Sequence, residues 1–157
     1  MIFYDLLLAC ALPFIAKKRH HYRRLFGLVP DPNGKDVVWI HAVSVGEAKA
    51  AQPLFRSLRQ IYPEAFFLIT TVTEAGLAEA RRSLAEADAF AYLPIDFRWI
   101  VRKWVRCLRP KLFLLMESDF WPNLLSAVKS SGGKVVLISG KLSERSAKRF
   151  RALSFFF

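Results

Sequence analysis

Residues 37–47 read VVWIHAVSVGE, and this stretch decides the fold. Val37–Val43 is a run of mostly apolar, β-branched residues, which is typical of a strand buried on both faces of a sheet. Ser44-Val45-Gly46-Glu47 follows at once and matches the Ser-x-x-Glu capping box that begins many helices. The stretch therefore predicts a buried strand that turns directly into a helix.

The alternation of strand and helix continues along the chain. Further buried strands are predicted at Phe66–Val72, Ala89–Leu93, Leu112–Met116 and Val135–Ser139. Helical patterns separate or follow them, at residues 48–62, Leu77–Ala87, 97–108, Pro122–Ser131 and Ser143–Leu153. Strand and helix alternating five times predicts an α/β domain with a parallel sheet and right-handed crossovers. We expect a Rossmann-like fold with flanking helices over residues 36–157.

The composition limits the chemical class of the binding partner but does not identify the partner. The chain has 157 residues, of which 54% are hydrophobic, so one domain with a sizeable core is expected. Its formal charge of +11 favours an anionic partner, which can be nucleic acid, an acidic membrane surface or a phosphorylated substrate. Basic and aromatic residues interleave over residues 97–109, but their helical spacing favours a packed amphipathic helix over a nucleic-acid surface.

The first 26 residues differ from the rest. Ile2–Ala16 is almost wholly apolar and Lys17–Arg24 reads KKRHHYRR, the reverse of the charge order in a signal peptide. The apolar run is also shorter than the ~20 residues of a spanning helix. We expect residues 1–26 to form a membrane-associating helix, with the basic cluster on anionic head groups at the cytoplasmic side. The alternative is a buried first helix followed by a solvated basic loop.

Several chemistries lack their sequence signatures. The first strand is not followed by GxGxxG or a Walker A loop, and no HExxH, GxSxG or EF-hand pattern occurs. Cys10 and Cys107 lie too far apart for a zinc spacing, so we predict free core thiols. His41 falls within a strand without visible metal partners, which favours a hydrogen-bonded core histidine. We therefore expect no metal and no cofactor.

Candidate site residues follow the strands, because a parallel sheet of this type binds ligands at the carboxyl ends of its strands. Glu47 can be the capping-box acid, or it can take a proton from an attacking hydroxyl beside the Gly46 turn. A second group follows the fourth strand in the stretch ESDFWPN. Its candidate residues are Glu117, Asp119, Trp121 and Asn123. A helix cap explains one acidic residue there, but it explains two with a tryptophan and an amide less well.

Five motifs occur in an order that points to a known family. They are Trp39–Glu47 (WIHAVSVGE), the Thr-rich turn Thr70–Gly76, Tyr92–Asp96 (YLPID), Glu117–Asn123 (ESDFWPN) and Lys141–Ser146 (KLSERS). Together they closely resemble the amino-terminal domain of 3-deoxy-D-manno-octulosonic acid (Kdo) transferase. The likeness covers nearly the whole chain, and the apolar start with its basic flank fits the same family.

The resemblance implies a GT-B glycosyltransferase, whose two Rossmann-like domains face a cleft, and it makes this chain the acceptor-binding half. The implied reaction is transfer of Kdo from CMP-Kdo to a lipid A precursor in lipopolysaccharide biosynthesis, with inversion. The implied location is the cytoplasmic side of the inner membrane of a Gram-negative bacterium.

The resemblance also implies roles for individual residues. Glu47 corresponds to the family's proposed general base, and Ser44 and Gly46 belong to the same motif. Glu117 and Asp119, with Trp121 and Asn123, line the same cleft. The basic residues of the first segment would hold the phosphates of the glycolipid; they are Lys17, Lys18, Arg19, Arg23 and Arg24. No metal is implied.

The chain also departs from the family pattern. It has Asp119 where the family usually has Glu, and Gly140–Ser143 where an Asn-Ala-Arg-Leu-Ser type sequence is usual. The turn Thr73–Gly76 lacks the usual Pro-Thr-Gly form. Family members are longer, and their carboxyl-terminal domain binds the CMP-sugar. We therefore expect a truncated or split chain without that domain, which does not transfer Kdo alone.

Two other functions stay open. One is another glycolipid GT-B transferase, similar to lipid A disaccharide synthase, although Ser44–Glu47 and Trp121–Asn123 favour Kdo transfer. The other is a non-catalytic basic module that binds membrane or nucleic acid. DNA binding whose affinity falls steeply with rising salt concentration, without a preference for lipid, would identify the nucleic-acid module.

Overall fold

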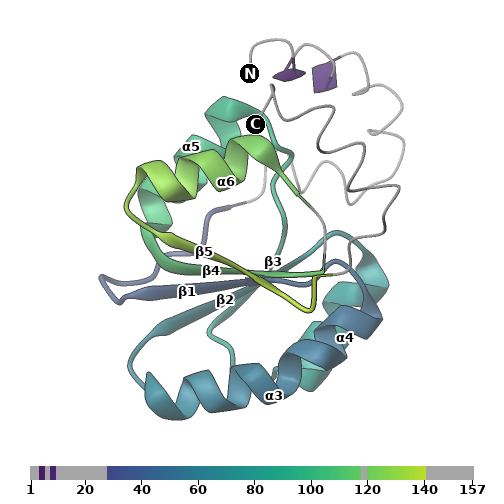
Figure 1. The fold of residues 1–157 in the computed structure, drawn as a ribbon. Coiled ribbons are helices and arrows are strands. Elements are labelled where there is room, and N and C mark those ends of the chain that lie inside the picture. The colour runs from purple at the N-terminus through teal and green to yellow at the C-terminus, as the bar shows by residue number, and fades with distance from the viewer. Residues whose placement is uncertain (1–3, 6–7, 10–27, 118–119, 141–157) are drawn as a thin grey trace.

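A computed structural model describes residues 4–5, 8–9, 28–117 and 120–140. Five parallel strands form one sheet: β1 (Val37–His41), β2 (Phe66–Thr71), β3 (Ala89–Tyr92), β4 (Pro110–Met116) and β5 (Lys134–Ile138). Their spatial order is β3-β2-β1-β4-β5, so β1 lies at the centre (Figure 1). The order reverses at β1, and the Rossmann-like α/β fold expected from the sequence is confirmed.

Helices cover both faces of the sheet. Helices α3 (Val45–Ile61) and α4 (Glu74–Ser83) lie side by side on one face, and α5 (Arg98–Leu108) and α6 (Pro122–Ser130) lie on the other (Figure 1). This division follows from the topology, because right-handed crossovers that move the chain in opposite directions along the sheet put their helices on opposite faces. The predicted helix at 143–153 lies outside the described residues.

The core has two halves because neighbouring residues of a strand point to opposite faces. Val37 and Trp39 of β1 pack under α5 and α6, where the Trp39 ring meets Phe113 edge to face with centroids 5.1 Å apart. Val38 and Ile40 pack under α3 and α4. All five residues of β1 are buried, so the prediction of a strand covered on both faces is confirmed for this strand.

The outer strands differ from that prediction. In β5, Val136 and Leu137 are 40% and 43% exposed, and most of β3 is only half-buried. The physical reason is position, since β3 and β5 are the outermost strands of the sheet that the structure describes. The expectation of strands buried on both faces is therefore wrong for these two.

Two further expectations need correction. Helix α4 begins at Glu74 and ends at Ser83, instead of running from Leu77 to Ala87, because the Thr73 side chain accepts from the N–H of Gly76 and begins the helix earlier. Cys107 is exposed on α5, so it is not a core thiol. The cause is helical phase, because the buried stripe of α5 passes through Trp104, Val105 and Leu108.

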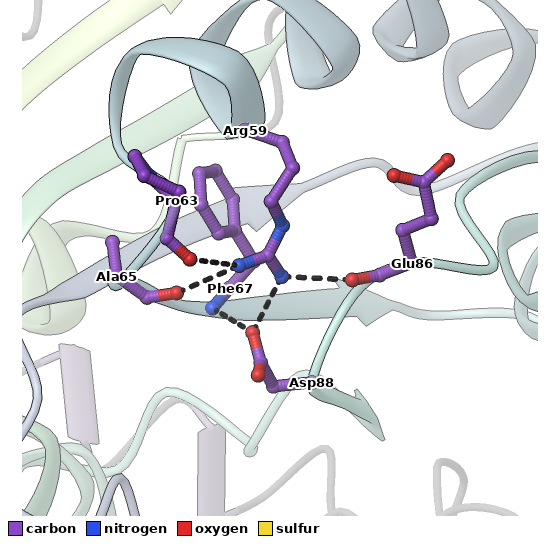
Figure 2. Close-up of polar contacts among 6 residues, drawn as sticks. All are labelled: Arg59, Pro63, Ala65, Phe67, Glu86 and Asp88. Carbon is purple, nitrogen blue, oxygen red and sulfur yellow. Dashed lines mark hydrogen bonds and ion pairs between the residues drawn. The ribbon is translucent and has the colours of Figure 1, made fainter.

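Arg59 joins three segments at the amino-terminal edge of the sheet (Figure 2). Its guanidinium donates to the carbonyl oxygens of Pro63, Ala65 and Glu86, and pairs with the Asp88 carboxylate at 2.6 Å. The guanidinium carbon also lies 4.3 Å from the centroid of the Phe67 ring. Burial raises the pKa of Asp88, but the Phe67 N–H and the Arg59 guanidinium outweigh burial and hold it below its ordinary value.

Described residues of the amino-terminal segment contact the α5–α6 layer. Asp5 accepts from the side-chain amide of Asn123 at 2.8 Å and from the Arg98 N–H at 3.4 Å. The Asp5 carboxylate also lies 3.6 Å from Nε of Arg98, and Leu8 packs against the core under these helices. Within the described residues, no helix combines the length and apolarity that crossing a membrane requires. The basic residues between 17 and 24 lie outside the described residues.

Candidate active site

The loop that joins β1 to α3 holds Glu47 in a capping arrangement. Ser44 is the N-cap of α3, and its Oγ accepts from the Glu47 N–H at 3.3 Å and donates to Glu47 Oε1 at 3.0 Å. Glu47 Oε2 accepts from the N–H of Val43 at 2.8 Å. Strand β1 ends at His41, two residues earlier than predicted, and the Val43 N–H bonds to Glu47 instead of to a neighbouring strand. The capping box expected from the sequence is therefore present in a modified form: Ser44 caps the Glu47 N–H, but the Glu47 carboxylate accepts from the N–H of Val43 instead of that of Ser44.

The Glu47 side chain is fixed and largely buried. The residue is 8% exposed, and each carboxylate oxygen accepts one hydrogen bond from its own loop. A carboxylate oxygen has two lone pairs, so each oxygen can accept one more hydrogen bond. The cap alone accounts for this arrangement. The general-base role predicted for Glu47 stays a prediction.

The loop after β2 supports the loop after β1. Thr73 Oγ1 donates to the Val43 carbonyl at 3.3 Å, and a Cβ placed on Gly76 would lie 2.9 Å from the same oxygen. Val43 thus contacts Thr73 through its carbonyl and Glu47 through its N–H. The sequence marked Thr70–Gly76 as a strand-ending turn but did not identify Thr73 and Gly76 as residues that position Glu47. The Thr-x-x-Gly spacing of a helix cap is the signal that could have found them.

His41 is a core residue, as predicted. It is fully buried, and its Nδ1 lies 3.1 Å from the Thr70 carbonyl oxygen and 3.0 Å from Thr70 Oγ1. The roles in these two contacts depend on the tautomer: a protonated Nδ1 donates to the Thr70 carbonyl, and an unprotonated Nδ1 accepts from the Thr70 hydroxyl. Trp39 Nε1 donates to the same Thr70 hydroxyl at 2.8 Å. These contacts tie β1 to β2 just below the candidate site.

Glu117 reaches the same edge of the sheet as the Glu47 loop. His41 of β1 is paired with Leu115 of β4, so Glu117 and Val43 each lie two residues beyond a matched pair. Glu117 has a left-handed φ of 60°, a conformation that is uncommon for a residue with a side chain and is found at turns and functional sites. Asp119, the second acid of this motif, lies outside the described residues.

Trp121 and Asn123 have mainly structural surroundings. Trp121 is half-buried, packs on the core under α5 and α6, and is the N-cap of α6. Asn123 is 2% exposed; its side chain donates to the Asp96 carbonyl at 2.6 Å and to Asp5. These hydrogen bonds lie within the α5–α6 layer, and none of them reaches the β1–α3 loop. A direct role of Asn123 in substrate binding stays a prediction.

Asp96 is a buried acid that the sequence did not single out. One of its carboxylate oxygens accepts from the Asn123 N–H at 3.0 Å and the other from the Leu124 N–H at 2.8 Å, so Asp96 caps α6 from the β3–α5 loop. Burial raises the pKa of Asp96 to about 6, with a smaller rise from Asp5, against the lowering by these two N–H groups. Among the described residues, no three His, Cys, Asp or Glu side chains gather as metal ligands would.

The fold and these loops define the class of the protein as a Rossmann-like α/β domain with its candidate groups at the carboxyl edge of the sheet. A family model described as 3-deoxy-D-manno-octulosonic-acid transferase (kdotransferase) matches residues 20–157. The chain belongs to this family of Kdo transferases.

Individual relatives agree with the family match. A 3-deoxy-D-manno-octulosonic acid transferase of Chlamydia muridarum is 41% identical over 118 residues, which cover 74% of this chain and 27% of the relative. The one of Haemophilus influenzae is 32% identical over 153 residues, covering 92% and 35%. A bifunctional glycosyltransferase/methyltransferase of Fusobacterium nucleatum is 28% identical over 160 residues, covering 97% and 25%. The chain thus spans between a quarter and just over a third of the length of these relatives.

Proposed function

We propose that this chain is the acceptor-binding half of a GT-B enzyme that transfers Kdo from CMP-Kdo to a lipid A precursor, with Glu47 as the general base. In this proposal, Glu47 removes the proton from the acceptor hydroxyl, the hydroxyl oxygen attacks the anomeric carbon of Kdo, and CMP leaves with inversion. The reaction takes place at the cytoplasmic side of the inner membrane. Membership of the Kdo transferase family supports the proposal.

The observation that carries the proposal is the fixed carboxylate at the carboxyl end of the central strand. Val43 and Ser44 hold the two oxygens of Glu47, so the group loses little side-chain freedom when it meets a substrate. Because each oxygen keeps one acceptor position, the carboxylate can still take a hydrogen bond from an acceptor hydroxyl. Glu117 directly follows the neighbouring strand β4 at the same edge and would contact the acceptor sugar.

The test is Glu47→Gln in a hybrid in which this chain is joined to the remaining carboxyl-terminal part of the Haemophilus influenzae relative. We expect kcat for CMP-Kdo-dependent transfer to fall by at least ~100-fold, the usual contribution of a general base, with KM for the acceptor changed little. Activity is expressed per folded molecule, using near-ultraviolet circular dichroism to measure the folded fraction.

Ser44→Ala is the matched control, because it removes the cap hydroxyl but keeps the carboxylate. It should lower stability by ~1 kcal/mol and lower kcat much less than Glu47→Gln. If Glu47→Gln retains transfer per folded molecule, Glu47 is only a cap and the proposed mechanism is wrong. If the parent hybrid transfers a different sugar and not Kdo, the proposed donor is wrong whatever Glu47 does.

A further inference from the structure

A groove runs along the outer surface of the domain between α5 and α6, away from the β1–α3 loop. Its volume is 660 Å³. Its walls are mainly arginine side chains of α5 and hydroxyl and small side chains of α6. The arginines are Arg98, Arg102, Arg106 and Arg109, and the hydroxyl residues are Ser126, Ser130 and Ser131.

The positive charge of this groove is poorly balanced. Neither α5 nor α6 contains an acidic residue. Arg98 is paired with Asp5, but within the described part of the chain Arg102, Arg106 and Arg109 form no ion pair. Elsewhere in the described part of the chain, Arg59 and Arg82 are each paired with a carboxylate, whereas Arg56 and Arg81 on α3 and α4 form no ion pair and line neither groove.

The spacing of these arginines makes their unbalanced positive charge unfavourable for the stability of α5. Arg98, Arg102 and Arg106 follow one another at i, i+4 and i+8, so their side chains are neighbours on one side of the helix. Like charges at this spacing destabilise a helix. Packing does not require the charges, because the buried stripe of α5 consists of other residues, among them Trp104 and Leu108. An anion in the groove would relieve the repulsion.

A second groove on the same helix contains an exposed apolar side chain that a ligand could contact. Arg102 and Arg106 also line a neighbouring groove of 510 Å³, which contains Trp99 and Lys103. Trp99 is 65% exposed, the largest exposed fraction among the large hydrophobic side chains of α5. Arg102 and Arg106 therefore line both grooves, so a ligand in either groove can reach them.

We propose that the α5–α6 groove binds a phosphate group, with Arg102 and Arg106 as its principal ligands. A guanidinium presents two parallel N–H groups that match two phosphate oxygens, and it stays charged at any physiological pH. Ser126 and Ser130 on the opposite wall offer neutral hydroxyl donors. The phosphate can belong to a membrane lipid head group or to a soluble phosphorylated molecule. This site is independent of Glu47 and of the proposed transfer reaction.

The first experiment titrates inorganic pyrophosphate into the full chain and measures binding by isothermal calorimetry at low salt. Arg102→Gln/Arg106→Gln is compared with Arg56→Gln/Arg81→Gln, which removes the same charge from exposed positions on α3 and α4, the opposite face. Arg109 is left unchanged because its φ of 44° makes substitution there a change of backbone strain as well. The melting temperatures of both variants are compared to confirm that they fold.

We expect the α5 variant to bind pyrophosphate at least ~10-fold more weakly than the parent chain, and the control variant to stay within about twofold. The second arm measures binding to phosphatidylcholine vesicles with and without phosphatidylglycerol. Selective loss of vesicle binding in the α5 variant identifies a lipid head group as the ligand, and selective loss of pyrophosphate binding alone identifies a soluble one. Equal binding by the parent, the α5 variant and the control in both arms would overturn the proposal.

Discussion

Glu47 can be a helix cap and a base at once. The cap uses one acceptor position on each carboxylate oxygen and fixes the side-chain conformation. A base that is already oriented needs less reorganisation when the substrate arrives. The cost is burial, because only a small part of this 8% exposed residue is accessible to a substrate hydroxyl.

At the scale of single residues, Arg59→Lys is predicted to lower the free energy of unfolding by ~2 kcal/mol. The guanidinium donates to three carbonyl oxygens and pairs with Asp88 from a side chain that is only 18% exposed. A lysine has all its donors on one nitrogen and cannot span these acceptors, so some of them stay unsatisfied. Urea denaturation followed by circular dichroism measures the change.

The control is Arg56→Lys, one turn earlier on the exposed side of the same helix. It should change the free energy of unfolding by no more than ~0.5 kcal/mol. Equal stability of Arg59→Lys and Arg56→Lys would show that charge alone, and not the forked geometry, accounts for the contribution of Arg59.

At the scale of elements, helices α3 to α6 begin in two different ways. Helices α3 and α4 are capped by local side chains, Ser44 and Thr73. Helices α5 and α6 have no side-chain cap from their own N-cap residues. Asp5 instead accepts from the first N–H of α5, and Asp96 accepts from two N–H groups of α6. Helix α4 is of direct interest to the site because its first turn touches the loop that holds Glu47.

Gly76→Ala is predicted to destabilise the protein by ~1–3 kcal/mol. The added Cβ would lie 2.8 Å from Thr73 Oγ1 and 2.9 Å from the Val43 carbonyl oxygen, so the first turn of α4 must move away from the β1–α3 loop. Thermal unfolding by calorimetry measures the loss.

Gly46→Ala, in the first turn of α3, is the matched comparison. The nearest atom to its Cβ is Ser44 Oγ at 3.9 Å, so there is room, and the higher helix propensity of alanine should leave stability unchanged or raised by up to ~1 kcal/mol. A destabilisation as large as that of Gly76→Ala would contradict the packing described for these two turns.

At the scale of the whole molecule, Asp96 is predicted to make stability depend on pH. Its pKa is about 6 in the folded chain against an ordinary 3.8, so between these values the folded state binds more protons than the unfolded state. Stability is therefore expected to fall as pH rises from 4 to 6, by at most ~3 kcal/mol from this group. Below pH 4 the contribution is fully present, and above pH 6 it is lost.

Asp96→Asn removes the titrating group, so the difference in the free energy of unfolding between wild type and variant should change across pH 4–6. The variant also loses one acceptor for the N–H groups of α6, so below pH 4 it should be less stable than the wild type, and this deficit should shrink as pH rises to 6. Denaturation curves at several pH values give both quantities. A stability difference that stays constant from pH 4 to 6 would show that Asp96 does not titrate in this range.

Much of this protein follows from its local patterns. Val37–Val43, and the apolar runs like it, predicted the parallel α/β fold because the period of hydrophobic residues is a property of each segment. Ser44-x-x-Glu47 predicted the capping box for the same reason, since its residues lie within four positions of one another. The ordered motifs, read together, also identified the Kdo transferase family, which the family match confirms.

Only the tertiary structure decided which strands lie outermost and which distant residues meet. The order β3-β2-β1-β4-β5 exposes much of β3 and β5, although their sequences resemble those of central strands. Asn123 is held by Asp96 and Asp5, and Thr73 supports Val43, across long sequence separations. Such contacts depend on how whole elements pack against one another. The residue types and spacing within one segment do not specify which distant residue will lie next to them.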